Sequence, residues 1–544
     1  MPQPPAIRSV IVAAITGLLY PLCFPDFDLG SLAWMVLVPL HLALAQPAPP
    51  RRSFWLGWLA GTLAFAGIMF WVITAMHQYG KVPLAISVLL MLLLATYLGL
   101  FLAVYALGWV WFKRRLPALA FLAAPCLWVT LEWLRTYLFS GLPWALLGYS
   151  QYQWLPVIQI ADITSVYGLS FLVILVNVSI AELILWGLAK RQAQSDPLPW
   201  PALAATVAAM AVTLAYGHWR LASPAPATQD RRSIAVGLVQ ANIDQAQKWD
   251  AAYRQATIDR YARLTVQAAS GVDLVIWPEA ATPFLFEREK DYKLEVMDLV
   301  RSRRVPLLFG SPALRYYPNG RPYLLNSAYL LSHDGILLGR YDKRHLVPFG
   351  EYIPLHSSLL FFLDKLVEGI GDFEAGAQAT VLSLPSQQTQ FSSNPSNGKA
   401  AFGVVICYEV IFPNLVREFA ANGADFMVTI TNDAWFGKSA AAYQHFGMVV
   451  LRAVENRRAF ARAANTGISG FIDPQGRILR ASPIFEEAAF TGTIPLDRTL
   501  TFYTNYGDVF AYACVIITGL FAWLSRQGTR RLGPYGSTKP ATGR

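Results

Sequence analysis

Charged residues are scarce in this chain, and their scarcity argues against an ordinary soluble protein. Asp, Glu, Lys and Arg make up 14% of the 544 residues, whereas soluble domains usually carry about 25%. The deficit is uneven, because residues 1–220 and the stretch around 509–525 are apolar while residues 230–500 have the composition of a globular domain. A chain of this length also exceeds one compact core. The sequence therefore predicts a membrane part and a separate globular part.

Cysteine is also rare, which excludes a disulfide framework in the globular part. Cys23, Cys126 and Cys514 lie in or beside apolar runs, and only Cys407 lies in the globular stretch. A lone thiol in an oxidising compartment is either well buried or useful. No cluster of metal-ligating residues and no phosphate-binding glycine loop is evident in the sequence. We therefore expect neither a metal ion nor another cofactor.

Eight apolar runs approach or exceed the length of about 20 residues that a bilayer-spanning helix needs. We expect membrane spans at 8–24, 30–46, 54–76, 83–112, 117–139, 163–188, 199–217 and 509–525. A signal peptide is the alternative for the first run, but it lacks a clear cleavage site and further spans follow, which favours a retained anchor. Buried core helices of a soluble protein fit poorly, because too many runs are long and have no polar face.

The net charge of +10 gathers beside the apolar runs, and this placement predicts the orientation. Basic pairs or triplets occur at 51–52, 113–115 and 190–191, and further arginines follow residue 525. By the positive-inside rule these segments and both termini lie in the cytoplasm, which leaves residues 218–508 outside. The same placement is unlike a phosphate-binding patch, so we expect no nucleic-acid partner.

The globular part alternates strands with helices, which predicts an α/β layered domain. The expected strands lie at 233–240, 272–277, 306–310, 325–331, 335–341, 401–406 and 426–431, with more between 460 and 494. The expected helices lie at 253–269, 294–304, 413–422 and 443–455. Residues 386–399 are rich in Gln, Ser and Asn and are expected to form an exposed loop.

Three polar residues follow predicted strands. Glu279 follows LVIWP, Lys343 follows the hairpin at 325–341, and Cys407 follows FGVVI. Strand ends are where α/β folds place their sites, and acyl transfer through a thiol needs a nucleophile, a base and a group that stabilises the oxyanion. Each residue also has a structural interpretation: an inert buried Cys407, a Glu279 that caps a following helix, and a solvated Lys343. The spacing of these residues in the sequence does not decide between the catalytic and the structural interpretations.

Three segments resemble the catalytic blocks of the nitrilase, or carbon–nitrogen hydrolase, superfamily: WPEAA, YDKRHLVPFGEYIP and ICYE, in that order. With the block TNDAWFG, a polytopic N-terminal half and one C-terminal span, the whole chain resembles the apolipoprotein N-acyltransferases of Gram-negative inner membranes. The resemblance implies an αββα sandwich on a bundle of about eight membrane helices. It implies a membrane domain with seven spans at 1–220, a periplasmic catalytic domain at 221–500, and a last span with a cytoplasmic tail at 501–544.

The resemblance also implies a Glu-Lys-Cys triad. Cys407 would be the nucleophile, Glu279 the general base and acid, and Lys343 the cation that stabilises the oxyanion. The implied substrates are a phospholipid acyl donor and a diacylated apolipoprotein acceptor, joined by a ping-pong reaction through a thioester. We expect a monomer in the lipid bilayer.

Four further residues would support the triad. Glu351 would orient Lys343 or the nucleophile, and Trp249 would lie at the mouth of the substrate site. Tyr408 and Glu409 would shape the pocket. The apolar stretch Ile353–Leu363 is either an arm that dips into the leaflet or a buried core helix.

Two other functions are weighed against this one. A membrane-anchored nitrilase-type amidase would hydrolyse a small amide, although several spans exceed what anchoring needs. A transporter with an external ligand-binding domain would need charges along a path through the membrane. The few candidates for such a path lie mostly near helix ends: Glu132, Arg135, Asp162 and Glu182.

Overall fold

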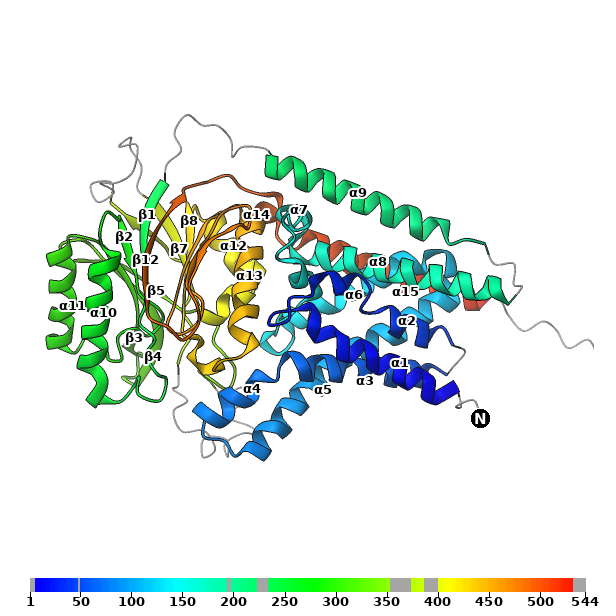
Figure 1. Cartoon of the computed structure of the whole chain (residues 1–544), viewed down its shortest axis with the longest axis horizontal. Helices are drawn as coiled ribbons and strands as arrows, with labels where there is room; N and C mark the ends of the chain where they lie inside the picture. The colour runs from blue at the N-terminus through cyan, green and yellow to red at the C-terminus, as the bar shows by residue number, and fades with distance from the viewer. Residues whose placement is uncertain are drawn as a thin grey trace, which may run out of the picture.

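A bundle of long helices lies beside a domain of two β-sheets in the computed structural model (Figure 1). The structure describes residues 5–46, 49–192, 197–222, 233–352, 373–385 and 400–531. The predicted arm at Ile353–Leu363 and the predicted loop at 386–399 lie outside the described residues.

The helical part is built from long apolar helices. Its principal helices are α1 (Pro5–Leu19), α2 (Val38–Leu44), α3 (Pro50–Ile68), α5 (Leu84–Arg115), α6 (Ala120–Tyr137), α8 (Ala161–Arg191), α9 (Trp200–Ala222) and α15 (Val509–Arg531). Among the described residues, five helices are long and apolar enough to cross a bilayer, and a bent pair would make a sixth span. Shorter apolar helices at Ile7–Cys23 and Gly30–Leu44 correspond to the first two predicted runs. The helical N-terminal region is confirmed, and the number of eight spans stays a prediction.

The predicted run 54–76 does not form one straight helix. α3 ends at Ile68, and a segment made of α4 (Trp71–Thr74) and the π-turn Ala75–Tyr79 leaves it at 50°. The bent segment carries aromatic rings to the TNDAWFG block: Trp71 lies 4.7 Å from Phe436 between ring centroids. A second such pair joins Tyr79 to Trp435 at 6.0 Å. A prediction from apolar length alone misses the bend, because the bend depends on a partner that is distant in the sequence.

The globular part consists of two six-stranded sheets. The first has the order β12-β1-β2-β3-β4-β5 and the second the order β11-β10-β9-β8-β7-β6. The strands of the first sheet are β1 (Ser233–Gln240), β2 (Leu274–Ile276), β3 (Leu307–Tyr316), β4 (Pro322–Leu331), β5 (Leu337–Asp342) and β12 (Ala488–Pro495). Those of the second are β6 (Val381–Leu384), β7 (Ala400–Ile406), β8 (Phe426–Thr431), β9 (Phe460–Ala464), β10 (Gly470–Ile472) and β11 (Ile478–Ala481).

Helices cover the outer faces of both sheets, as Figure 1 shows. One layer holds α10 (Arg254–Ala268) and α11 (Lys290–Arg303), and the other holds α12 (Pro413–Ala421) and α13 (Ala440–Asn456). The second layer lies between its sheet and the helical bundle (Figure 1). The interior strands β7 and β8 are buried along their whole length, which explains their continuous apolar sequences. The predicted α/β layered domain is confirmed.

Parallel pairing brings several strand ends to shared edges. β1, β2 and β3 run parallel, and β5 shares their direction because it and β3 both pair antiparallel with β4. In the second sheet β7, β8 and β9 run parallel. Glu279 follows β2, Lys343 follows β5 and Cys407 follows β7, and the TNDAWFG block begins at the end of β8.

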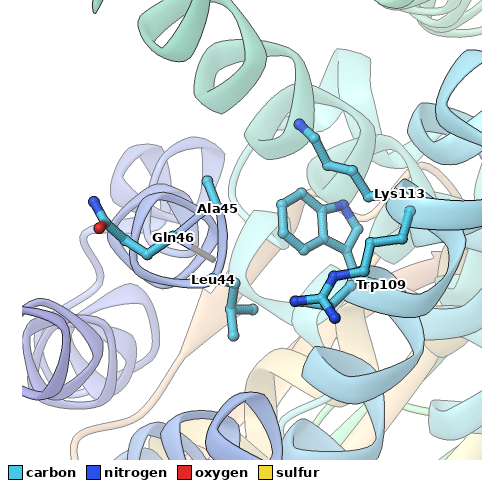
Figure 2. Close-up of a pocket in the computed structure, with 7 residues that line it drawn as sticks. Leu44, Ala45, Gln46, Trp109 and Lys113 are labelled. Atoms are coloured by element: carbon cyan, nitrogen blue, oxygen red, sulfur yellow. The ribbon is translucent and has the colours of Figure 1, made fainter. Parts of the chain in front are cut away.

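A separate cavity lies at the C-terminal end of α5. Its volume is about 290 Å³, and its lining consists of Leu44, Ala45, Gln46, Trp109, Val110, Lys113 and Arg114. Figure 2 shows Trp109 and Lys113 on α5 facing the end of α2. The ammonium of Lys113 lies 5.2 Å from the centroid of the Trp109 ring. Lys113 and Arg114 belong to the basic segment at 113–115, which the sequence places beside the membrane, and none of the lining residues is a predicted site residue.

Candidate active site

A tight turn after β2 positions Glu279. Ala280 has a positive φ of 47°, and the turn packs directly on Gly310 of β3. A Cβ at Gly310 would lie 2.5 Å from the Ala280 nitrogen and 2.7 Å from the Glu279 Cα, so only glycine allows this approach. The next helix, α11, begins only at Lys290. The interpretation of Glu279 as the cap of a following helix is therefore wrong.

Lys343 lies between two carboxylates at the end of β5. Its Nζ donates to Glu351 Oε1 at 2.9 Å and lies 3.6 Å from Glu279 Oε1. Asn326 joins the same two groups, because its Nδ2 donates to Glu279 Oε1 at 2.7 Å and to Glu351 Oε1 at 2.8 Å. The Lys343 side chain is 1% exposed, which rules out a solvated hairpin lysine. Burial alone would lower the pKa of Lys343, but Glu351 and Glu279 raise it above its usual value, so the cation is permanent.

The second sheet supplies the other side of the Glu279 carboxylate. Glu279 Oε2 accepts the backbone N–H of Asn432 at 2.8 Å, just after β8. Its Oε1 accepts from Asn326 of the first sheet. The carboxylate therefore spans the two sheets, and hydrogen bonds fix both of its oxygens.

Cys407 occupies a strained turn directly after β7. Its φ is +53°, a conformation that a residue with a side chain rarely adopts, and such strain is concentrated at functional sites. Cys407 is partly exposed, whereas Cys23, Cys126 and Cys514 are buried. Burial and the negative charge of Glu279 raise the pKa of Cys407, and the Lys343 charge opposes them. The resting residue is therefore a thiol, and its deprotonation requires a nearby base.

A buried network supports Cys407 from behind. His445 Nε2 lies 3.2 Å from the Cys407 carbonyl oxygen, and because a carbonyl only accepts, this nitrogen carries the hydrogen. Burial and the Arg462 charge lower the pKa of His445, which keeps the ring neutral. Asp433 Oδ2 pairs with Arg462 at 2.8 Å. Asp433 lies in the TNDAWFG block, and its role in this network depends on partners that are distant in the sequence.

Glu409 and Tyr408 brace the site rather than face its centre. Glu409 Oε1 accepts from the Arg344 N–H at 2.6 Å and from the Tyr341 hydroxyl at 2.7 Å, and its Oε2 accepts from the Ile406 N–H at 2.7 Å. It therefore ties the Lys343 segment to the Cys407 turn. The Tyr408 hydroxyl donates to the Gly141 carbonyl at 2.9 Å, which reaches into the helical part.

Trp249 lies on the segment after β1 and is 48% exposed. Its neighbour Lys248 contacts Glu279 directly. Lys248 is 2% exposed, and its Nζ donates to the Glu279 carbonyl oxygen at 3.1 Å. Trp249 is the predicted site residue of this segment, whereas Lys248, the residue before it, carries no motif that would identify it from the sequence. Among the described residues, no group of three or more His, Cys, Asp or Glu side chains is arranged to hold a metal ion.

Comparison with known families covers both parts of the chain. A model of the apolipoprotein N-acyltransferase N-terminal domain matches residues 16–179, and a carbon–nitrogen hydrolase model matches residues 235–502. Among solved structures, an amidase of the nitrilase superfamily from Nesterenkonia AN1 is 20% identical, with a TM-score of 0.36, and covers 52% of this chain and 93% of its own.

Relatives named apolipoprotein N-acyltransferase match almost the whole chain. The relative from Geobacter metallireducens is 43% identical over 522 residues, which is 95% of both chains. Those from Azotobacter vinelandii and Chlorobaculum tepidum are 34% and 32% identical, over 91% and 95% of this chain and 91% and 96% of their own. This full-length match supports an acyltransferase and does not fit the alternative of a nitrilase-type amidase. The chain belongs to the apolipoprotein N-acyltransferase family.

Proposed function

We propose that the chain transfers a fatty acyl group from a phospholipid to the α-amino group of the N-terminal S-diacylglyceryl-cysteine of lipoproteins, through a thioester on Cys407. The observation that carries the proposal is the placement of Lys343, held between Glu279 and Glu351 beside the strained Cys407 turn. A thiol, a carboxylate and a permanent buried cation provide the nucleophile, the base and the oxyanion-stabilising charge that acyl transfer requires.

The first half of the reaction acylates Cys407. Glu279 takes the thiol proton as the sulfur attacks the ester carbonyl of the phospholipid. The oxyanion forms near Lys343 and the backbone N–H of Tyr408. When the carbon–oxygen bond breaks, Glu279 returns the proton to the departing lysophospholipid oxygen. The raised pKa of Cys407 favours such concerted proton transfer over a standing thiolate.

The second half passes the acyl group to the amine. The free α-amine of the lipoprotein, with a reference pKa of about 8, attacks the thioester carbonyl. Glu279 accepts the amine proton, and the proton then goes to the Cys407 sulfur as the carbon–sulfur bond breaks. The products are an amide and the original thiol, so the enzyme returns to its starting state.

The adjoining helical part supports an amine acceptor over water. Tyr408 bonds to Gly141, and the Tyr352 hydroxyl donates to Ser140 Oγ at 3.2 Å, so the site is built against the segment after α6. Both substrates carry acyl chains and reach the site from the bilayer. An apolar approach excludes water from the thioester and so favours transfer over hydrolysis.

The proposal includes the topology that the sequence predicts. Eight spans, with both termini in the cytoplasm, place the catalytic domain at 221–500 in the periplasm beside the outer leaflet of the inner membrane. The membrane domain is 1–220, and 501–544 holds the last span and its tail. We propose that the enzyme acts as a monomer. Thiol labelling of single-cysteine variants tests the orientation: a cytoplasmic residue 290 would overturn it.

The reaction is tested with purified protein, a phospholipid and a diacylated lipopeptide. The expected product is a triacylated peptide, detected by mass spectrometry, with one lysophospholipid released per peptide. Cys407→Ala should give none, and Cys126→Ala serves as the matched control because Cys126 is a buried cysteine in the helical part. Release of free fatty acid without triacylated peptide would contradict the proposal.

A further inference from the structure

Lys248 is a buried lysine at the site for which the triad mechanism has no role. Its side chain is 2% exposed, and its Nζ has one hydrogen bond to the described residues, to the Glu279 carbonyl oxygen at 3.1 Å. An ammonium group has three donors, and burying it with one neutral acceptor is costly. A lysine kept in this position therefore requires a compensating interaction.

The segment that carries Lys248 holds Glu279 once directly, through Lys248, and once indirectly, through Asn432. Gln245 accepts a hydrogen bond from Asn432 Nδ2 at 2.7 Å, and the backbone N–H of Asn432 holds Glu279 Oε2. Lys248 holds the carbonyl of Glu279 itself. The strained turn at Ala280 is thus held by this segment as well as by its packing on Gly310. The segment after β1 positions the proposed base.

Lys248 brings a second positive charge to a centre that holds several carboxylates. Glu279 and Glu351 bring two negative charges, and Lys343 brings one positive charge. Asp433 is already paired with Arg462, and His445 is neutral. Glu409, which is 0% exposed, adds a further carboxylate beside the Lys343 segment. Lys248 therefore offsets buried negative charge that Lys343 alone does not compensate, and leaving such charge uncompensated is strongly unfavourable. Its positive charge also lies near Glu279 and Cys407, where it favours the thiolate that forms as the proton leaves.

We propose that Lys248 is a second cationic positioning residue of the acyl-transfer site, which holds the Glu279 turn and whose charge allows the thiol proton of Cys407 to be transferred. This proposal rests on the proposed acylation of Cys407. It extends the triad by a residue that does not touch the substrate carbonyl and acts through Glu279 and the local field.

The charge of Lys248 depends on pH near neutrality, unlike that of Lys343. Burial lowers the pKa of Lys248 to about 8, although Glu279, and Cys407 when it is ionised, oppose this shift. The groups that face it are therefore Glu279 on the β2 turn and Cys407 after β7. As the pH rises through about 8, Lys248 becomes neutral and the centre loses one positive charge. Acylation should then slow at alkaline pH, even though thiols react faster there in general.

The test is the burst rate of Cys407 acylation by phosphatidylglycerol alone, measured from about pH 6.5 to about pH 9.5. This donor has no amine to titrate, and the acceptor amine is absent. The wild type should show a falling limb centred near pH 8. Lys248→Arg keeps the charge at every pH in this range, so the limb should disappear. The Lys248→Met enzyme should acylate Cys407 about 10-fold more slowly, or slower still, below pH 8, because the positive charge near Cys407 and Glu279 is gone. Its rate should show no falling limb, since no group is left at position 248 to titrate.

Lys290→Met is the matched control, since Lys290 is an exposed lysine at the start of α11. It should keep both the rate and the limb of the wild type. A limb near pH 8 that persists in Lys248→Arg, or a Lys248→Met enzyme as fast as the wild type, would overturn the proposal. If Lys248→Met does not fold, the wild-type and Lys248→Arg profiles still decide. A wild-type enzyme that forms no thioester at any pH would contradict the proposed function instead.

Discussion

Two regions among the described residues that bury charged side chains use them differently. One is the catalytic centre around Lys343. The other is the junction between α8 and the region of α13, where Asp162 Oδ2 accepts from Arg220 and Arg457, each at 2.8 Å. At the junction Glu455 Oε1 also accepts from Ser165 Oγ at 2.7 Å and from the Val166 N–H at 3.0 Å.

The difference lies in where the hydrogen bonds lead. The junction bonds join the helical part to the catalytic domain and contact no predicted site residue. At the centre, by contrast, the bonds fix Glu279 and Lys343 around a partly exposed cysteine in a strained turn. The comparison teaches that burial of charge alone does not identify a catalytic site. Buried charge that surrounds a partly exposed nucleophile does.

Removing Lys343 should produce the largest effect. Lys343→Ala should slow acylation of Cys407 by about 10²–10³, the usual value of an oxyanion donor. Lys343→Arg should be nearly as slow, because a planar guanidinium does not fit where a point charge lies between two carboxylates. Single-turnover acylation in detergent measures both, with Lys290→Ala as the control. If Lys343→Ala acylates Cys407 at a rate within a few-fold of wild type, Lys343 does not stabilise the oxyanion, and backbone N–H groups alone must do so.

The junction should respond in stability rather than in chemistry. Asp162→Asn leaves Arg457, which is 7% exposed, without its carboxylate, and breaking a buried pair costs about 3 kcal/mol or more. Thermal unfolding should therefore occur at a lower temperature, while the acylation rate of the folded enzyme stays near that of wild type. Exposed Asp298→Asn is the control. A large loss of rate in folded Asp162→Asn would erase the distinction between the two regions.

Glu351→Gln should have an intermediate effect at the centre. The amide keeps the shape but removes the charge that Lys343 and the Val347 N–H bind, at 2.9 Å and 2.8 Å. A hydrogen bond to a charged group contributes about 1.5–3 kcal/mol, so acylation should slow by about 10-fold to 10²-fold. Single-turnover rates give the answer, and an unchanged rate would show that Glu279 alone positions Lys343.

The smallest expected effect is a pH dependence at the junction. Burial raises the pKa of Glu455 from 4.5 to about 7, although Arg452 opposes it. The folded state therefore keeps a proton that the unfolded state has released, so the free energy of unfolding falls as pH rises from about 4.5 to about 7. The melting temperature should drop more across this window in wild type than in Glu455→Gln. Equal drops would show that Glu455 does not titrate there.

Much of the fold could be predicted because it depends on local patterns. Buried strands such as β7 and β8 read as continuous apolar runs, and the hairpin of β4 and β5 has a turn signal between its strands. The bend after Ile68 could not be predicted, since it depends on ring contacts with Trp435 and Phe436, which lie more than 350 residues away in the sequence. Apolar length alone also does not settle the number of spans.

The site could be predicted only in part, for the same reason. Glu279, Lys343 and Cys407 were found because each follows a strand within a distinctive block. Asn326 was missed because it lies within β4 and carries no motif, and its role depends on two carboxylates brought to it by folding. The bonds of Glu409 to the Arg344 N–H and the Ile406 N–H likewise exist only in three dimensions.

The central claim is that Cys407 carries the acyl group, and one measurement tests it directly. Enzyme incubated with phospholipid and no acceptor should accumulate an acyl adduct that intact-protein and peptide mass spectrometry place on Cys407. Neutral hydroxylamine should remove the adduct, as expected for a thioester, and addition of a diacylated peptide should discharge it. Cys407→Ala should form no adduct, whereas Cys126→Ala should behave as wild type. An acyl adduct on any other residue, or triacylated peptide made by Cys407→Ala, would contradict the account.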